Sequence, residues 1–197
     1  MRSFANTPAL RALLSGWKQH LATLGLAWLV VLAVDTWRTR DFPRGPAPET
    51  SLLMVRAADT GTGNEHVDTS LAQWRAAHPG KPIALHFWAE WCAICQLEEP
   101  EVAALSADWP VLGIAMQSGN AARVRLVQQQ RALPWPTAVD THGAVSRSWG
   151  VRAVPTLVVL DPQGHVRFST TGYTPEWAMR WRLWWAQVIP RWTLPSG

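Results

Sequence analysis

The sequence FWAEWCAICQLEEP, residues 87–100, contains both cysteines of this 197-residue chain. It overlaps the apolar run PIALHFWA at 82–89, which predicts a buried strand. A helix is expected to follow over Cys92–Ala107. Because Cys92 and Cys95 are separated by two residues at this junction of strand and helix, the pair favours redox chemistry over a framework of structural disulfides.

The position of each cysteine at the helix start suggests its task. The unpaired N–H groups and the dipole of the first turn stabilise an anion, so they favour the reactive thiolate of Cys92. Cys95 lies further along the turn and more buried, where it can attack a mixed disulfide formed on Cys92.

Other functions of the cysteine pair fit the sequence less well. A structural zinc site requires four ligands. The chain has no second cysteine pair, so His78 and His86 would have to complete the site. Covalent haem attachment requires a histidine after the second cysteine, where this chain has Gln96. An inert buried pair stays open as an alternative.

Strands and helices alternate along the rest of the chain. Pro100 is expected to interrupt the helix that follows the cysteines, and Asp161-Pro162-Gln163-Gly164 predicts a hairpin turn. This alternation indicates a three-layer α/β domain. The expected strands are 51–57, 111–117, 137–140, 156–160 and 166–170, and the expected helices are 69–77, 121–133, 144–149 and 174–189.

An uncharged run, LATLGLAWLVVLAV at Leu21–Val34, lies near the N-terminus. We interpret residues 21–37 as a retained transmembrane anchor, because Trp28 and Trp37 suit a membrane environment or its interface. No small-x-small cleavage site follows closely. A cleaved signal peptide and a buried core helix are the alternatives, since fourteen residues is short for a membrane span.

This interpretation divides the chain into four parts. Residues 1–20 form a cytoplasmic N-terminal segment and residues 21–37 the anchor. Residues 38–50, RTRDFPRGPAPET, contain three prolines and are expected to be a linker. Residues 51–197 form the globular domain.

Charge and aromatic content constrain the partners. The net charge is +4, but the arginines are scattered, which argues against binding to nucleic acid. In the last predicted helix, Trp177, Trp181, Trp184 and Val188 share one face, which we expect to cover the sheet. Trp185 lies off that stripe, as does Trp192, and such residues could contact lipid or a redox partner.

Two motifs resemble the thioredoxin superfamily. Trp91 precedes the cysteine pair and Pro100 follows it by five residues, as in that family, and Val154-Pro155-Thr156 matches a second motif. The resemblance implies a thioredoxin fold with a central mixed sheet, preceded here by the anchor. It also implies that the Val154–Pro155 peptide bond is cis and that these two residues bind substrate. Trp91, at the exposed end of the strand, joins them as a substrate-binding candidate.

Within that superfamily the chain is most similar to the TlpA/DsbE-like branch, especially ScsD-like membrane-anchored proteins. The shared pattern is Cys-x-x-Cys-x-x-Glu-x-Pro, with Glu98 as the acid. The resemblance implies attachment to the bacterial inner membrane, a periplasmic domain and a DsbD-type membrane electron donor. No metal or cofactor beyond the Cys92–Cys95 disulfide is expected.

Three residues are candidates for tuning the cysteines. His86 stands where thioredoxins carry an acid that assists proton transfer; the alternative is a core histidine bonded to backbone. Glu90 either tunes the thiol or is simply exposed, and Glu98 is the third. We expect a protein-disulfide oxidoreductase that reduces client disulfides. The alternatives are a dithiol oxidase and a non-enzymatic protein that binds Cu(I) through its thiols.

Overall fold

The computed structural model describes residues 19–30, 33–34, 42–43, 45–55 and 66–188. The chain forms two compact units, Met1–Arg40 and Asp41–Gly197. In the first unit the described residues are helical. No helix among the described residues has both the length and the apolar character needed to cross a membrane. Part of the expected anchor, 31–32 and 35–37, lies outside the described residues, so the anchor stays a prediction.

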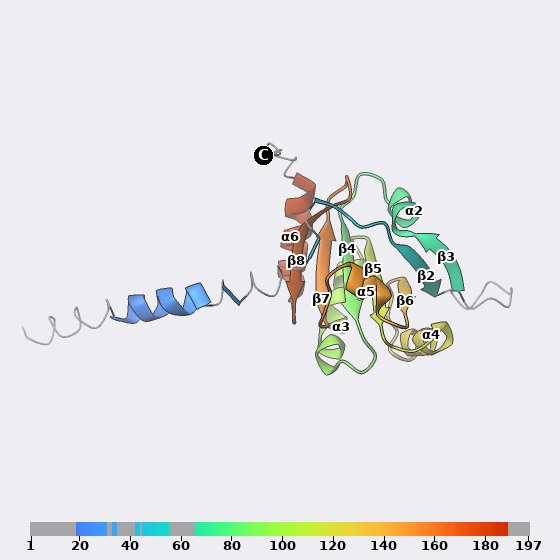
Figure 1. Ribbon diagram of the computed structural model, residues 1–197, viewed down its shortest axis with the longest axis horizontal. Helices are drawn as coiled ribbons and strands as arrows, with labels where there is room; N and C mark the ends of the chain where they lie inside the picture. The colour runs from blue at the N-terminus through green and yellow to red at the C-terminus, as the bar shows by residue number, and fades with distance from the viewer. Residues whose placement is uncertain (1–18, 31–32, 35–41, 44, 56–65, 189–197) are drawn as a thin grey trace, which may run out of the picture. The chain divides into compact units, whose positions relative to one another are not determined.

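The second unit is built on one mixed sheet, which Figure 1 shows at its centre. Its order is β1-β8-β7-β4-β5-β6-β2-β3; β4, β5 and β6 run parallel, and β7 lies antiparallel to β4. This confirms the expected mixed sheet. The strands are β1 (Gly45–Pro46), β2 (Ser51–Val55), β3 (His66–Ser70), β4 (Ile83–Trp88), β5 (Val111–Met116), β6 (Thr137–Asp140), β7 (Thr156–Leu160) and β8 (His165–Thr171).

Helices cover both faces of the sheet, which gives the expected three layers. Alternate residues of β4 point to opposite faces. Ile83, Leu85 and Phe87 pack with residues at the ends of α2 (Leu71–Ala76) and α5 (Ala144–Ser148). Ala84 and Trp88 belong to clusters on the other face, formed with α3 (Ala93–Ser106), α4 (Ala121–Gln130) and α6 (Glu176–Val188).

The start of the second unit differs from the expected linker at 38–50. Gly45 and Pro46 pair with β8, and the Phe42 side chain is only 6% exposed. Part of this proline-containing segment therefore packs on the domain. An edge strand can accommodate proline because one side of it needs no hydrogen-bond donor.

The helix α2 begins later than expected. Residues 66–70 extend as β3, and the helix starts at Leu71 instead of residue 69. Ser70 is the cap: its hydroxyl accepts the Gln73 N–H, and the Gln73 side chain accepts the Ser70 N–H. This reciprocal capping box fixes the boundary, and the polar sequence of β3 gave no signal for a strand.

Two further helices correct our expectations. The helix α3 is continuous through Pro100, although proline cannot donate the usual backbone hydrogen bond. The helix α6 turns its other face to the sheet: the residues predicted to cover it, including Trp177, are exposed. The buried face consists of smaller or flexible side chains that allow close packing, namely Ala178, Met179, Leu183 and Ala186.

Candidate active site

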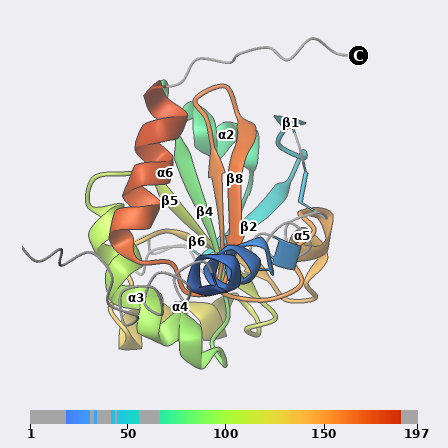
Figure 2. The ribbon, with the colours of Figure 1, turned by 90° about the vertical axis from the view of Figure 1, so that its left-hand side faces the viewer.

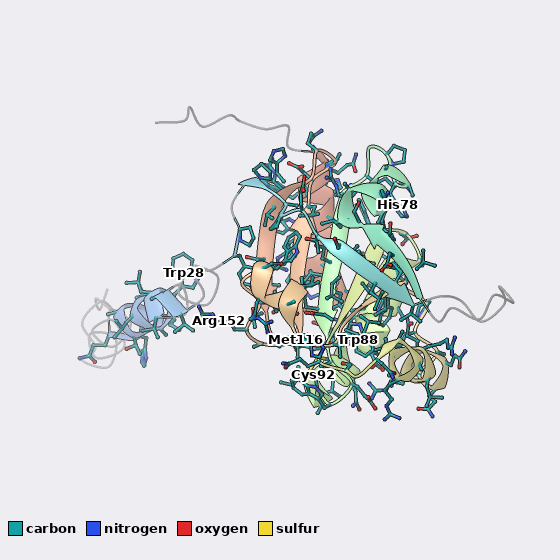
Figure 3. The ribbon with its side chains drawn as sticks, turned by 45° about the vertical axis from the view of Figure 1, so that its right-hand side comes forward. Trp28, His78, Trp88, Cys92, Met116 and Arg152 are labelled. Atoms are coloured by element: carbon teal, nitrogen blue, oxygen red, sulfur yellow. A yellow bond between two sulfur atoms is a disulfide. The ribbon has the colours of Figure 1, made fainter. Side chains whose placement is uncertain are left out.

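The two cysteines lie where β4 ends and α3 begins. Figure 3 shows Cys92 beside Trp88 and Met116, the last residues of two parallel strands, with His78 at the opposite end of the domain. Cys92 and Cys95 are joined by a disulfide. Cys92 is 7% exposed and Cys95 only 1%, so the first sulfur is the one closer to solvent.

Cys92 is also the N-cap residue of α3. Its sulfur accepts a hydrogen bond from the backbone N–H of Cys95 at 3.1 Å. The orphan N–H groups of a helix start favour negative charge at this position. The same geometry would stabilise a Cys92 thiolate once the disulfide is reduced, which is the property that the predicted nucleophile of the pair requires.

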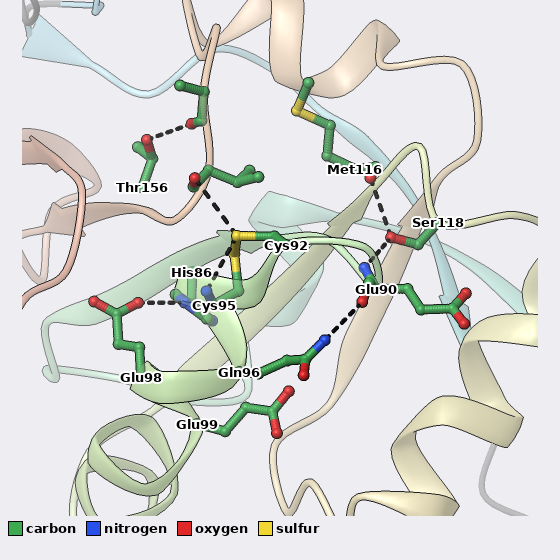
Figure 4. Close-up of a disulfide and its surroundings, with 12 residues drawn as sticks. His86, Glu90, Cys92, Cys95, Gln96, Glu98, Glu99, Met116, Ser118 and Thr156 are labelled. Carbon is green, nitrogen blue, oxygen red and sulfur yellow. Dashed lines mark hydrogen bonds and ion pairs between the residues drawn. A yellow bond between two sulfur atoms is a disulfide. The ribbon is translucent and has the colours of Figure 1, made fainter.

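A distant loop faces the disulfide. The Val154–Pro155 peptide bond is cis, and the Val154 carbonyl oxygen lies 3.6 Å from the Cys92 sulfur (Figure 4). Pro155 is followed directly by β7, which is paired with β4, so the sheet itself holds this loop against Cys92. The structure thus brings together the two motifs that lie about sixty residues apart in the sequence.

A buried histidine–carboxylate pair lies below the disulfide. His86 on β4 and Glu98 on α3 are each 1% exposed, and the imidazole Nε2 is 2.9 Å from the Glu98 carboxylate. The other carboxylate oxygen accepts the backbone N–H of Thr174 at 2.6 Å. No described residue forms a hydrogen bond with Nδ1 of His86. This histidine is therefore bonded to an acid, not to backbone as the alternative reading supposed.

Glu90 anchors the turn before the cysteines. Its carboxylate forms an ion pair with Arg123 of α4, and the hydrogen bond from that guanidinium lowers the pKa of Glu90, against the opposing effect of burial. The Glu90 N–H donates to Ser118, and its carbonyl accepts hydrogen bonds from Gln96 and Arg131. Glu90 is therefore neither free nor simply exposed: it ties the turn to α4.

Exposed apolar side chains surround the disulfide. Trp91 is 63% exposed, Ile94 is 49% and Leu97 is 72%. The Trp91 indole N–H donates to the Gln117 carbonyl at 3.2 Å, which orients the ring. Large apolar groups left in water beside a reactive sulfur suit contact with a partner.

Several residues of the site gave no signal in the sequence. Ser118, Arg123, Arg131 and Thr174 reach the turn or the buried acid from elements far along the chain. Only their arrangement in space brings them to the cysteines. Among the described residues, no group of three or more His, Cys, Asp or Glu side chains could hold a metal ion.

The mixed sheet, the capping cysteine and the cis-proline loop define a class, the thiol–disulfide oxidoreductases of the thioredoxin type. The chain belongs to the AhpC/TSA family, whose model matches residues 45–169. A thioredoxin-like protein of Haemophilus influenzae is 28% identical over 168 residues, which are 85% of this chain and 93% of that relative.

Relatives named as thiol:disulfide interchange proteins confirm the expected branch. The DsbE protein of Xylella fastidiosa strain 9a5c is 30% identical over 64% of this chain and 65% of its own length. The DsbE homologue of Paracoccus denitrificans is 32% identical over 48% of this chain and 52% of its own. The closer likeness to ScsD-like proteins stays a prediction.

Solved structures support the same fold. A secreted thiol-disulfide isomerase from Corynebacterium glutamicum has a TM-score of 0.60 at 18% identity, covering 71% of this chain and 84% of its own. StoA from Bacillus subtilis has a TM-score of 0.51 at 21% identity, covering 71% and 98%. The thioredoxin-like fold inferred from the motifs is therefore confirmed.

Proposed function

We propose that this protein is a membrane-anchored periplasmic oxidoreductase that reduces disulfides in client proteins. The observation that carries the proposal is the placement of Cys92: its sulfur caps α3, lies 3.6 Å from the Val154 carbonyl, and is more exposed than that of Cys95. A sulfur at a helix start and near the surface has the features of an attacking thiolate.

The reaction begins with the reduced pair. The Cys92 thiolate attacks one sulfur of a client disulfide, forms a mixed disulfide and releases the other client sulfur as a thiolate. The thiolate of Cys95 then attacks the Cys92 sulfur and releases the second client sulfur. The client gains two electrons and two protons, and the protein is left with the Cys92–Cys95 disulfide seen in the structure.

The client would bind across the cis-proline loop. Val154 and Pro155 present their backbone beside the reactive sulfur, where an extended client segment can pair with it. Trp91, Ile94 and Leu97 supply apolar contact around that segment. These contacts would select clients by exposed backbone and nearby apolar side chains, not by charge.

The buried pair of His86 and Glu98 would accept the proton of Cys95. Glu98 lies one helical turn beyond Cys95 on α3, and Figure 4 shows the bond between its carboxylate and His86. Cys95 must lose its proton to attack the mixed disulfide, and at 1% exposure it has little access to water. A carboxylate–imidazole pair at this depth suits general-base work. We therefore assign His86 and Glu98 to deprotonation of Cys95.

The proposed location rests on the N-terminal sequence, and the proposed electron source on the resemblance to the TlpA/DsbE-like branch. The uncharged run Leu21–Val34 supports anchoring through residues 21–37, and a redox pair on a short tether is best used outside the reducing cytoplasm. A DsbD-type membrane protein would then return the Cys92–Cys95 disulfide to the dithiol. Floating the full chain on lipid vesicles tests the anchor, and alkaline extraction that releases the chain would contradict it.

Two rivals use the same cysteines. A dithiol oxidase would run the exchange in reverse, and a Cu(I)-binding protein would hold the metal between the two soft sulfurs. The redox potential of the cysteine pair, measured at equilibrium with glutathione, distinguishes a reductant from a dithiol oxidase. A potential near about −270 mV suits a reductant, and one near about −120 mV suits an oxidant. Tight Cu(I) binding without turnover would favour the second.

Turnover is the primary test. With a chemical reductant as electron source, we expect the full chain to reduce a protein disulfide and the Cys92→Ser variant to lose that activity. Ser148→Ala, on the exposed end of α5, is the matched control and should keep full activity. Activity that survives Cys92→Ser would contradict the proposed nucleophile.

A further inference from the structure

The helix α6 carries a row of exposed aromatic side chains. Trp177 is 74% exposed, and Trp181 and Trp184 are 51% and 50%. Trp185 stacks on Trp181 with 5.4 Å between ring centroids, and Val188 extends the row. These five residues, called here the tryptophan face, span about 17 Å of helix at 1.5 Å per residue. An exposed apolar surface of this kind usually marks an interaction site.

We propose that the tryptophan face of α6 lies in the interfacial zone of a lipid bilayer, parallel to its surface. The inference rests on the membrane anchor of the proposed function. Tryptophan is the residue type enriched at membrane–water interfaces, because its ring is apolar and its N–H needs a polar partner. No described residue accepts a hydrogen bond from the indole N–H of Trp177, Trp181, Trp184 or Trp185. Lipid headgroups and interfacial water would supply those acceptors.

The edge of the sheet where the described part of the domain begins lies beside this face. The described part of the domain begins at Phe42, and its first strand, β1, pairs with β8 at one edge of the sheet. Phe168 of β8 contacts Trp181, with 6.1 Å between ring centroids, and Figure 2 shows α6 alongside this strand. The uncharged run ends at Val34 and Phe42 is buried in the domain, so the connection spans at most about 28 Å.

The charges of α6 indicate apolar rather than electrostatic adsorption. Arg180 forms ion pairs with Glu176 and Asp108 beside the tryptophan face. The five residues of the face itself carry no charge. Binding should therefore require no anionic lipid and change little with salt, unlike the adsorption of a basic helix.

Adsorption would also place the catalytic end of the domain near the membrane. Trp177 follows Thr174 by three residues, and the Thr174 N–H binds the buried Glu98 of the active-site helix. A face fixed on lipid therefore holds the Cys92 end close to the surface. The protein would favour clients whose disulfides lie near the bilayer.

A spin label on α6 tests this directly. In the oxidised full chain both native cysteines are bonded, so Trp184→Cys offers a single thiol for a nitroxide. Leu126→Cys is the matched control: Leu126 is 41% exposed on α4, which packs against β2, whereas α6 packs against β7. Each labelled chain is reconstituted into phosphatidylcholine vesicles, with and without phosphatidylglycerol.

The expected result is a severalfold rise, on moving from detergent to either vesicle, in the ratio of oxygen to nickel-chelate collisions at position 184. The ratio at position 126 should stay that of an aqueous site. A label at 184 that stays open to the nickel chelate overturns the inference. Shielding from both reagents also overturns it and indicates a protein partner or a second copy.

Flotation and disulfide reduction, measured on the same samples, separate this inference from the proposed function. A chain that floats and reduces disulfides while the label at 184 stays in water contradicts only the adsorbed face. A chain that does not float contradicts the anchor, and with it the present inference.

Discussion

Glu98 is a buried acid with two defined partners. Its carboxylate contacts the His86 imidazole of β4 and accepts the N–H of Thr174, which lies just before α6. An ionisable side chain at 1% exposure is unfavourable unless it is paired or serves a task. Its position one turn after Cys95 is the basis of the proposal that it helps to accept the proton of Cys95.

We predict that Glu98→Gln slows the release of the mixed disulfide by about a hundredfold, at the lower end of general acid–base contributions. Glutamine keeps an oxygen for the Thr174 N–H, so the fold should survive. The first attack by Cys92 should change much less. Stopped-flow measurement of both phases checks this, and equal slowing of both phases would contradict the assignment.

Glu90 supplies a pH-dependent contribution to stability. Its hydrogen bond from Arg123 lowers the pKa of Glu90 below the ordinary 4.5, so the folded state binds this proton less readily than the unfolded state. The contribution is therefore fully present above pH 4.5 and is lost as the pH falls through the lowered pKa.

We predict that Glu90→Gln lowers the melting temperature at neutral pH and that the difference from wild type shrinks in acid. Thermal unfolding from neutral to acidic pH measures this directly. Arg123→Gln should show the same profile, and the double variant should add no further loss. A difference that persists in strong acid would mean that the ion pair is not its source.

Among the elements, α2 shows how a local signal sets a boundary. Ser70 and Gln73 exchange side-chain and backbone hydrogen bonds at its N-terminus. The hydroxyl satisfies a backbone donor that would otherwise lack a partner. The helix therefore begins where this capping box forms, two residues later than the pattern alone indicated.

We predict that Ser70→Ala lowers the free energy of unfolding by about 1 kcal/mol. Ser148→Ala is the control, because the Ser148 hydroxyl donates to a carbonyl at the exposed end of α5 and caps no helix start. Chemical denaturation measures both variants. Equal losses would indicate a general effect of serine replacement and not the capping box.

Across the whole molecule, the long apolar strands were the most predictable features. The run at 156–160 became β7 with the same bounds, and the cysteine pair fell at a helix start as expected. The strands β1 and β3 were missed, since two residues of one and the polar sequence of the other carry no periodic signal. Their existence depends on neighbours elsewhere in the sheet.

The helix α6 shows the limit of periodicity. It is apolar on both faces, so spacing cannot tell which one is buried. In the structure the side with Ala178 and Met179 packs on the sheet, and the tryptophans are exposed. Likewise, the contacts of Arg123 and Thr174 join segments that are distant in sequence, which no local pattern reveals.

In the proposed reaction Cys92 attacks the client disulfide and Cys95 resolves the mixed disulfide. The most direct test of this order is the mass of each single-cysteine variant after incubation with a client peptide disulfide. We predict a stable peptide adduct on Cys92 in the Cys95→Ser chain and little adduct on Cys95 in the Cys92→Ser chain, where the remaining sulfur is buried. An adduct that forms mainly on Cys95 would contradict this order of attack.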